Sequence, residues 1–135
     1  MKTSKYAAVP LAVGLALAAA SPAAASPAAA ATRVTLTNAD DGRNVILDLG
    51  DDVEVRLSSY RANGLTYTWS IPVSSVPLVL RRTSGSTTPN GGAQAVFHAE
   101  SPGVSTITAV RHCRADPGRT CPLVVVPWKI TAEVR

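Results

Sequence analysis

The sequence predicts an all-β domain, an antiparallel β-sandwich of about eight short strands. After Thr32 apolar residues alternate with polar ones, as in the run Val45, Leu47 and Leu49, and a period of two is typical of strands with one buried face. Turn sequences rich in Asp, Gly and Pro separate these runs, and no run has the periodicity of a helix. The 135 residues are 46% hydrophobic but only 4% aromatic, so the chain suffices for one small domain with a mainly aliphatic core.

The alternating runs place the strands in order along the chain. We expect them at Val34 to Leu36, Val45 to Leu49, Val53 to Leu57, Thr66 to Ile71, Leu78 to Arg82, Ala93 to Ala99, Val104 to Arg111 and Leu123 to Val134. The stretch from Ser84 to Gly92 is predicted to be a polar loop, because Ser, Thr, Pro and Gly dominate it. Trp69, Phe97 and Trp128 are expected to add bulk to the core, and Pro127 to interrupt the last strand. Strands of this number and length suit an immunoglobulin-like sandwich.

The first 31 residues have the pattern of a secretory signal followed by a leader rich in Ala and Pro. An uncharged apolar run from Tyr6 to Ala20 follows two lysines, and small residues that a signal peptidase accepts stand at Ala23 to Ala25 and at Ala28 to Ala31. The apolar run is shorter than the roughly 20 residues of a membrane-spanning helix. We therefore expect a secreted monomer whose sandwich domain is residues 32–135, with no membrane association after cleavage.

The charge of the chain argues against a nucleic-acid partner. The formal net charge of +4 falls to +2 without the two leader lysines, since eleven basic residues then stand against nine acidic ones. Nucleic-acid-binding domains usually carry a dense stripe of Lys and Arg. The two basic groups present, Arg81-Arg82 and Arg111 with Arg114 and Arg119, are interpreted first as solvated surface. The group of Arg111, Arg114 and Arg119 lies in or beside the loop between Cys113 and Cys121, which a disulfide would make rigid, and rigid loops are common binding sites.

Cys113 and Cys121 are predicted to form a disulfide. An exported chain favours oxidised cysteines, and Asp116-Pro117-Gly118 between them is a turn sequence. Such a turn would bring the flanking strands back antiparallel and the two sulfur atoms together. The alternative makes Cys113 a nucleophile that acts with His98 or His112.

No residue is predicted to be catalytic, and no metal ion or cofactor is expected. The two histidines form neither a triad nor a metal-ligand spacing, and Asn90-Gly91-Gly92 lacks the Lys-Ser/Thr ending of a phosphate-binding loop. The acidic pairs Asp40-Asp41 and Asp51-Asp52 each adjoin a glycine. That position favours turn residues, with a calcium site as the alternative.

The stretch from Val45 to Val134 resembles the chagasin-type inhibitors of papain-like cysteine proteases. Pro89-Asn90-Gly91-Gly92 and the later Pro102-Gly103 match the family's glycine-pair loop and the turn beyond the next strand. Tyr67-Thr68-Trp69 matches the aromatic-x-Trp that follows the family's first binding loop. Similarity of these segments implies the family's fold, an immunoglobulin-like sandwich with three binding loops at one end.

Two of the family's motifs are altered here. The first loop usually reads Asn-Pro-Thr-Thr-Gly, whereas this chain has Ala62-Asn63-Gly64-Leu65-Thr66. The third motif, Arg-Pro-aromatic, keeps only its arginine in Arg111-His112-Cys113. The resemblance implies protease contacts at Asn63, Gly64, Leu65, Thr66, Asn90, Gly91, Gly92, Arg111 and His112.

The implied function is reversible inhibition of a papain-like cysteine protease without chemistry by the inhibitor. Glycine loops can approach a cleft closely, and Leu65 can fill an apolar subsite. Two alternatives remain open. One is a secreted recognition module that uses the same loops to bind another protein or the cell wall without inhibiting a protease, and the other is a purely structural domain.

Overall fold

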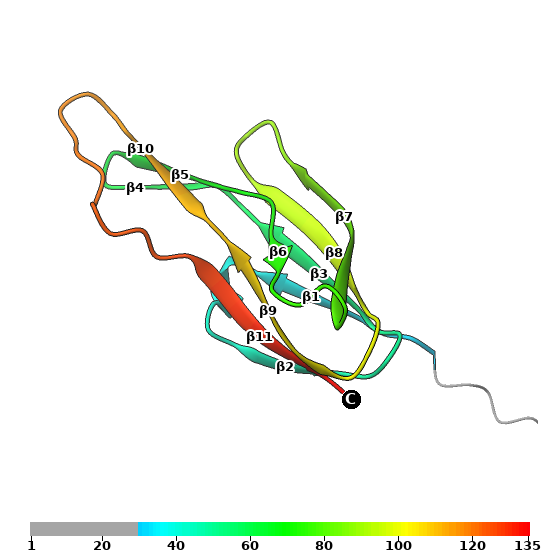
Figure 1. The fold of residues 1–135 in the computed structure, drawn as a ribbon. Coiled ribbons are helices and arrows are strands. Elements are labelled where there is room, and N and C mark those ends of the chain that lie inside the picture. Colours follow the sequence, from blue (N-terminus) through cyan, green and yellow to red (C-terminus); the bar gives the residue numbers. More distant parts are fainter. Residues whose placement is uncertain (1–29) are drawn as a thin grey trace, which may run out of the picture. The chain divides into compact units, whose positions relative to one another are not determined.

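The computed structural model describes residues 30–135, and their strands fall in one compact unit, Ala31–Arg135 (Figure 1). The predicted signal sequence lies outside the described residues. Within the described range, no helix is both long and apolar enough to cross a membrane.

Two four-stranded sheets form a sandwich. The first has the strand order β1-β3-β8-β7 and the second has the order β2-β11-β9-β6. Their bounds are β1 Arg33–Thr37, β2 Asn44–Leu47, β3 Asp52–Leu57, β6 Val73–Ser74, β7 Leu80–Thr87, β8 Ala93–Ala99, β9 Gly103–Ala109 and β11 Trp128–Val134, with a short 3-10 helix η2 at Asn38–Asp40. The predicted all-β sandwich is confirmed.

Both sheets are mixed, whereas the sequence analysis expected antiparallel pairing throughout. β1 pairs with β3 in parallel, and β2 pairs with β11 in parallel. β2 lies between β1 and β3 in the chain but belongs to the other sheet. Because the chain crosses to that sheet and back, β3 can run in the same direction as β1, as a parallel pair requires.

The core lies between the inner faces of the two sheets. Val53 and Phe97 from the first sheet and Ile130 and Trp128 from the second are at most 2% exposed. Trp69 belongs to the same buried cluster with 7% exposure. The expectation that Trp69, Phe97 and Trp128 supply bulk to the core is confirmed.

The predicted polar loop from Ser84 to Gly92 is wrong in its first half. Ser84 to Thr87 belong to β7, which pairs with β8 along its length with one irregularity between Arg82 and Ser84. β7 is an edge strand, and after its first residue every side chain is exposed. Its first residues were predicted as part of the strand Leu78 to Arg82, but from Ser84 on only backbone pairing defines the strand, and a polar sequence shows no apolar alternation.

Two other predicted strands have different bounds in the structure. The predicted strand Val104 to Arg111 is divided at Val110 into β9 and a further strand, β10 (Arg111–Ala115). The predicted strand Leu123 to Val134 begins only at Trp128, after Pro127. Proline has no N–H to donate to a sheet ladder, which explains why strand pairing begins only after Pro127.

A third sheet positions the candidate site. It contains β10, β5 (Leu65–Trp69) and β4 (Tyr60–Ala62), in the order β10-β5-β4. Ser70 and Val110 lie where this sheet joins the sandwich strands along the chain, and they bond to each other: the Ser70 N–H donates to the Val110 carbonyl at 2.9 Å and the Val110 N–H donates to Ser70 Oγ at 2.8 Å. We call this sheet, together with residues 116–127, the arm. In Figure 1 the arm extends from one end of the sandwich.

Candidate functional site

A two-residue hairpin turn, Asn63-Gly64, joins β4 and β5 near the outer end of the arm. Ala62 and Leu65 pair on either side of it, and both turn residues have positive φ, +53° and +76°. Asn-Gly is the preferred sequence for a hairpin turn that needs positive φ at both central positions. Leu65, which the sequence analysis placed in a loop, therefore lies in β5, and Thr66, the first residue of a predicted strand as well as the last of the first-loop motif, lies there too.

The glycine-pair loop, residues 88–92, packs against the other end of β5. The Trp69 N–H donates to the Gly91 carbonyl at 3.0 Å. Gly91 has φ +92°, and a Cβ at this position would collide with the side chain of Thr68. Glycine is needed here because the loop packs closely against β5 with a left-handed backbone.

Gly92 is also confined by the protein itself. It is buried, and a Cβ on it would lie 2.7 Å from the Leu57 carbonyl oxygen and 2.9 Å from Thr88 Oγ1. Asn90 is exposed at the outside of the loop. Packing inside the domain thus accounts for both glycines, and Asn90 is the predicted contact residue that this loop presents to solvent.

Arg111 lies on the opposite edge of β5 from Gly91. It pairs with Trp69 in the register of β10 and β5, and its guanidinium carbon is 4.3 Å from the ring centroid of Tyr67. Arg111 Nη1 donates to Tyr60 Oη at 2.7 Å, and the rings of Tyr60 and Tyr67 stack with centroids 4.9 Å apart. Cation–π contact and hydrogen bonding hold the arginine in one orientation before any partner binds.

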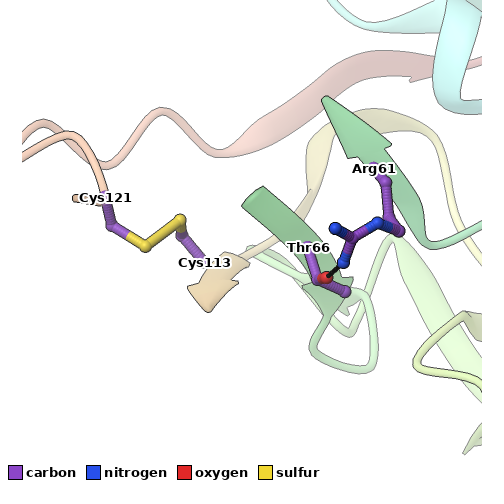
Figure 2. Close-up of a disulfide and its surroundings, with 4 residues drawn as sticks. All are labelled: Arg61, Thr66, Cys113 and Cys121. Carbon is purple, nitrogen blue, oxygen red and sulfur yellow. Dashed lines mark hydrogen bonds between the residues drawn. A yellow bond between two sulfur atoms is a disulfide. The ribbon is translucent and has the colours of Figure 1, made fainter. Parts of the chain in front are cut away.

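The predicted disulfide between Cys113 and Cys121 is present in the structure (Figure 2). The turn between them also forms, since the Arg119 N–H donates to the Asp116 carbonyl at 3.0 Å and Gly118 has φ +83°. The expected antiparallel return is wrong. β10 pairs with β5 instead, and the chain after the turn forms no strand before Trp128 in the structure. A disulfide sulfur is not a thiolate. In this oxidised state Cys113 therefore cannot be the nucleophile that the alternative interpretation requires.

The disulfide loop is joined to the hairpin by an arginine–aspartate pair. Arg61 Nη2 lies 2.5 Å from Asp116 Oδ2, and Arg61 also donates to Thr66 Oγ1 (Figure 2). The hydrogen bond from Arg61 lowers the pKa of the Asp116 carboxyl, and the positive charges of Arg114 and Arg119 lower it further. The disulfide loop and the adjacent hairpin therefore carry more positive than negative charge around the ionised Asp116 carboxylate.

The predicted contact residues therefore fall into two groups along β5. Asn63 and Gly64 lie near the outer end beside the disulfide loop, where the Asp116 N–H donates to the Gly64 carbonyl at 3.0 Å. The glycine-pair loop and Arg111 flank Trp69 at the base. Five residue steps, from Gly64 to Trp69, separate the groups, about 16 Å at the rise of a strand. His112 lies at the base too, paired with Thr68 and exposed.

A hollow of about 210 Å³ lies beside the glycine-pair loop. Its lining includes Arg56, Ser58, Thr88, Asn90 and Gln94 and is mostly polar. Sites for small organic ligands usually enclose about 300 to 1,000 Å³ with mainly apolar walls. The hollow does not resemble such a site.

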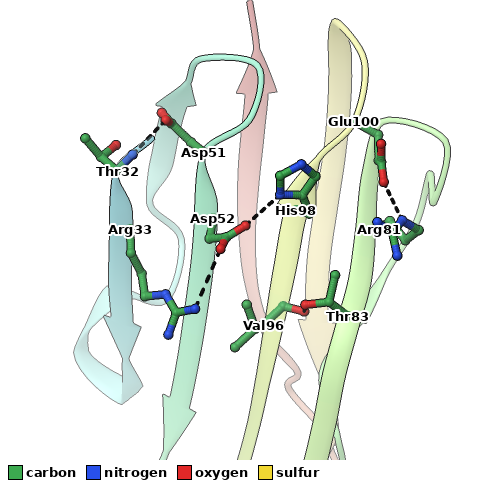
Figure 3. A network of polar contacts seen from close by, with 9 residues as sticks. All are labelled: Thr32, Arg33, Asp51, Asp52, Arg81, Thr83, Val96, His98 and Glu100. Carbon is green, nitrogen blue, oxygen red and sulfur yellow. Dashed lines mark hydrogen bonds and ion pairs between the residues drawn. The ribbon is translucent and has the colours of Figure 1, made fainter. Parts of the chain in front are cut away.

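His98 lies in β8, an inner strand of the first sheet, on the half-exposed face of that strand. Its Nδ1 is 2.8 Å from Asp52 Oδ1, and the Arg33 guanidinium is 3.6 Å from the same carboxylate (Figure 3). Within residues 30–135, no serine, threonine or cysteine is hydrogen-bonded to His98, whereas a catalytic triad needs one. The arrangement is an imidazole–carboxylate pair across β3 and β8.

The acidic turn residues bind backbone groups of their own chain. Asp51 accepts hydrogen bonds from the N–H groups of Asp48 at 3.0 Å and Thr32 at 3.1 Å, and these bonds lower the pKa of its carboxyl. Asp40 accepts from the Thr37 N–H at 2.7 Å at the start of η2. In the described part of the chain no three potential metal ligands cluster. The turn interpretation is confirmed for Asp40 and Asp51.

Comparisons with known proteins give structural similarity and no sequence family. No family model matches the chain, and no curated protein sequence matches it. The cysteine protease inhibitor EhICP2 from Entamoeba histolytica superposes with a TM-score of 0.51 at 11% identity, covering 77% of this chain and 96% of that one. The domain thus shares the β-sandwich fold of EhICP2.

Two further solved structures are less similar. An inclusion body protein from Burkholderia cenocepacia has a TM-score of 0.47 at 15% identity, with 67% of this chain and 59% of that chain covered. PbICP-C, solved in complex with falcipain-2, has a TM-score of 0.41 at 12% identity, with 83% and 96% covered.

Proposed function

We propose that the protein is a secreted, reversible inhibitor of papain-like cysteine proteases and that it acts through the arm end of the sandwich. The observation that carries the proposal is the convergence on Trp69 of three segments that are distant in the sequence. Trp69 belongs to the β4–β5 hairpin, its N–H binds the glycine-pair loop, and its register partner is Arg111. These are the segments in which the sequence resembles the chagasin-type inhibitors.

The fold supports the same proposal, because EhICP2, a cysteine protease inhibitor, shares it. The physical basis is steric exclusion of substrate. Hydrogen bonds, the tyrosine stack and the disulfide fix the exposed groups of the arm before binding, which lowers the entropy cost of ordering them, about 0.5 to 1.5 kcal/mol for each long side chain. No bond of the inhibitor has to be made or broken.

Export to an oxidising compartment is part of the proposal. The signal-like N-terminal sequence and the disulfide-bonded arm support it. A secreted inhibitor would meet secreted or foreign proteases there.

The test is a titration of several active-site-titrated papain-like proteases with the oxidised domain. We expect inhibition constants below about 1 μM, full recovery of activity on dilution, and an inhibitor of unchanged mass after the assay. Absence of inhibition at micromolar concentrations, by protein with an intact β-sheet circular dichroism spectrum, would refute the proposal.

A further inference from the structure

Four consecutive aliphatic side chains are exposed on the arm, in the segment Leu123 to Val126. Leu123 is 98% exposed, and the three valines after it are 71%, 62% and 53% exposed. Pro122 and Pro127 bracket the segment and cannot donate to a sheet ladder. A run of this kind is costly for a soluble domain unless a partner covers it.

Both ends of the exposed segment are fixed to ordered structure. Cys121 is tied to β10 by the disulfide with Cys113. At the other end Trp128 is 2% exposed, and its Nε1 donates to the Thr37 carbonyl at 3.1 Å. Figure 1 shows the segment passing from the tip of the arm back to β11. The apolar side chains therefore lie on a segment that is attached at both ends. Such a segment loses less conformational entropy on binding than a free tail would lose.

The charge of the arm defines the chemistry of the partner. The arm contains the four arginines Arg61, Arg111, Arg114 and Arg119 and one acidic residue, Asp116, a net charge of +3. The rest of residues 30–135 contains seven basic and eight acidic side chains. An apolar segment beside this positive surplus fits an apolar cleft with carboxylates along its border.

Resting on the proposed function, we infer that the segment Leu123 to Val126 is a specificity-determining contact of the inhibitor. It occupies an apolar part of the protease's substrate cleft, while the arm arginines face carboxylates on the border of that cleft. The segment follows the disulfide loop of the arm directly in the chain, with only Pro122 between Cys121 and Leu123. Proteases with an acidic cleft border are therefore the preferred targets, and electrostatic attraction accelerates their association with the inhibitor.

The experiment compares two matched double variants in the protease titration. Leu123→Ser with Val125→Ser removes apolar groups that are 98% and 62% exposed, and Leu78→Ser with Val104→Ser removes groups that are 83% and 56% exposed. The control pair lies near the start of β9, whereas the arm follows its end. Because all four side chains are on the surface, both variants should fold, which circular dichroism and thermal unfolding check.

We expect the arm variant to raise the inhibition constant at least tenfold and the control variant to change it less than twofold. Added salt should slow association of the wild type more than that of a variant with Arg114→Ala and Arg119→Ala. Equal inhibition by the wild type and the arm variant would overturn the inference and leave the proposed function standing.

Two other results would also overturn it. A wild-type dimer in gel filtration that the arm variant loses would assign the segment to a second copy, and wild-type binding to phosphatidylserine vesicles that this variant loses would assign it to a membrane. If the wild type inhibits no protease, the proposed function fails and the inference fails with it.

Discussion

Replacing Gly91 by alanine tests whether the glycine-pair loop is fixed by packing inside the protein. Gly91 has φ +92°, and its Cβ would collide with the Thr68 side chain. Gly42 has a similar φ of +83° with nothing within 4 Å of a Cβ, so Gly42→Ala introduces the backbone strain alone, about 1 to 2 kcal/mol. Gly91→Ala adds an overpacking cost of about 1 to 3 kcal/mol. We expect it to lower the free energy of unfolding by about 2 to 5 kcal/mol.

Urea unfolding followed by tryptophan fluorescence measures both variants, and a third variant isolates the contact. Thr68→Ser removes the methyl group that Gly91→Ala would strike, so the double variant should regain most of the overpacking cost and keep the strain. Equal destabilisation by Gly91→Ala and Gly42→Ala, or no recovery in the double variant, would refute the packing explanation. Close approach to a partner would then again be the reason for the glycine.

Three further predictions concern the arm and the acidic turns. Replacing Cys113 and Cys121 by serine should lower the free energy of unfolding by about 2.5 kcal/mol in the chain-entropy model, and equal urea midpoints for this variant and the oxidised wild type would contradict that. Hydrogen bonds from the Asp48 N–H and a second backbone N–H lower the pKa of Asp51, so its stabilising effect is complete above the unfolded value of about 4 and is lost as the pH falls through the folded value. Asp51→Asn should therefore flatten the decline of unfolding free energy below about pH 4, and an unchanged decline would speak against this role. Arg111→Ala should weaken inhibition by about 1 to 3 kcal/mol, 5- to 150-fold, if the Arg111 guanidinium donates a charge-assisted hydrogen bond to the protease that is buried in the complex.

The sandwich was predictable because most of its strands bury one face. Ala93 to Ala99 is a clear case: Ala93, Ala95, Phe97 and Ala99 are buried and the residues between them are more exposed, so the alternation in the sequence matches the strand bounds. The second half of β7, Ser84 to Thr87, was missed because an edge strand with exposed side chains leaves no such pattern. Parallel pairing was missed because alternation defines a strand but not its partner.

The arm was only partly predictable. Asn63-Gly64 carries a recognisable hairpin signal, which would have placed Leu65 in the strand that was predicted to start at Thr66. Leu123 to Val126 has the composition of a buried strand, and only its flanking prolines indicate otherwise. The contact between Arg111 and Tyr67 depends on the register of β5 and β10, which is a tertiary property that no local pattern encodes.

The central claim is that the arm end of the sandwich occupies a protease cleft. Hydrogen exchange of the protein, alone and with a saturating papain-like protease whose catalytic thiol carries a small blocking group, tests this claim most directly. The account predicts slower exchange of backbone amides in residues 60–66, 88–92 and 111–127, with β1 and β6 unchanged. Unchanged exchange in these three segments at saturation, or slower exchange confined to the sandwich outside the arm end, would contradict it.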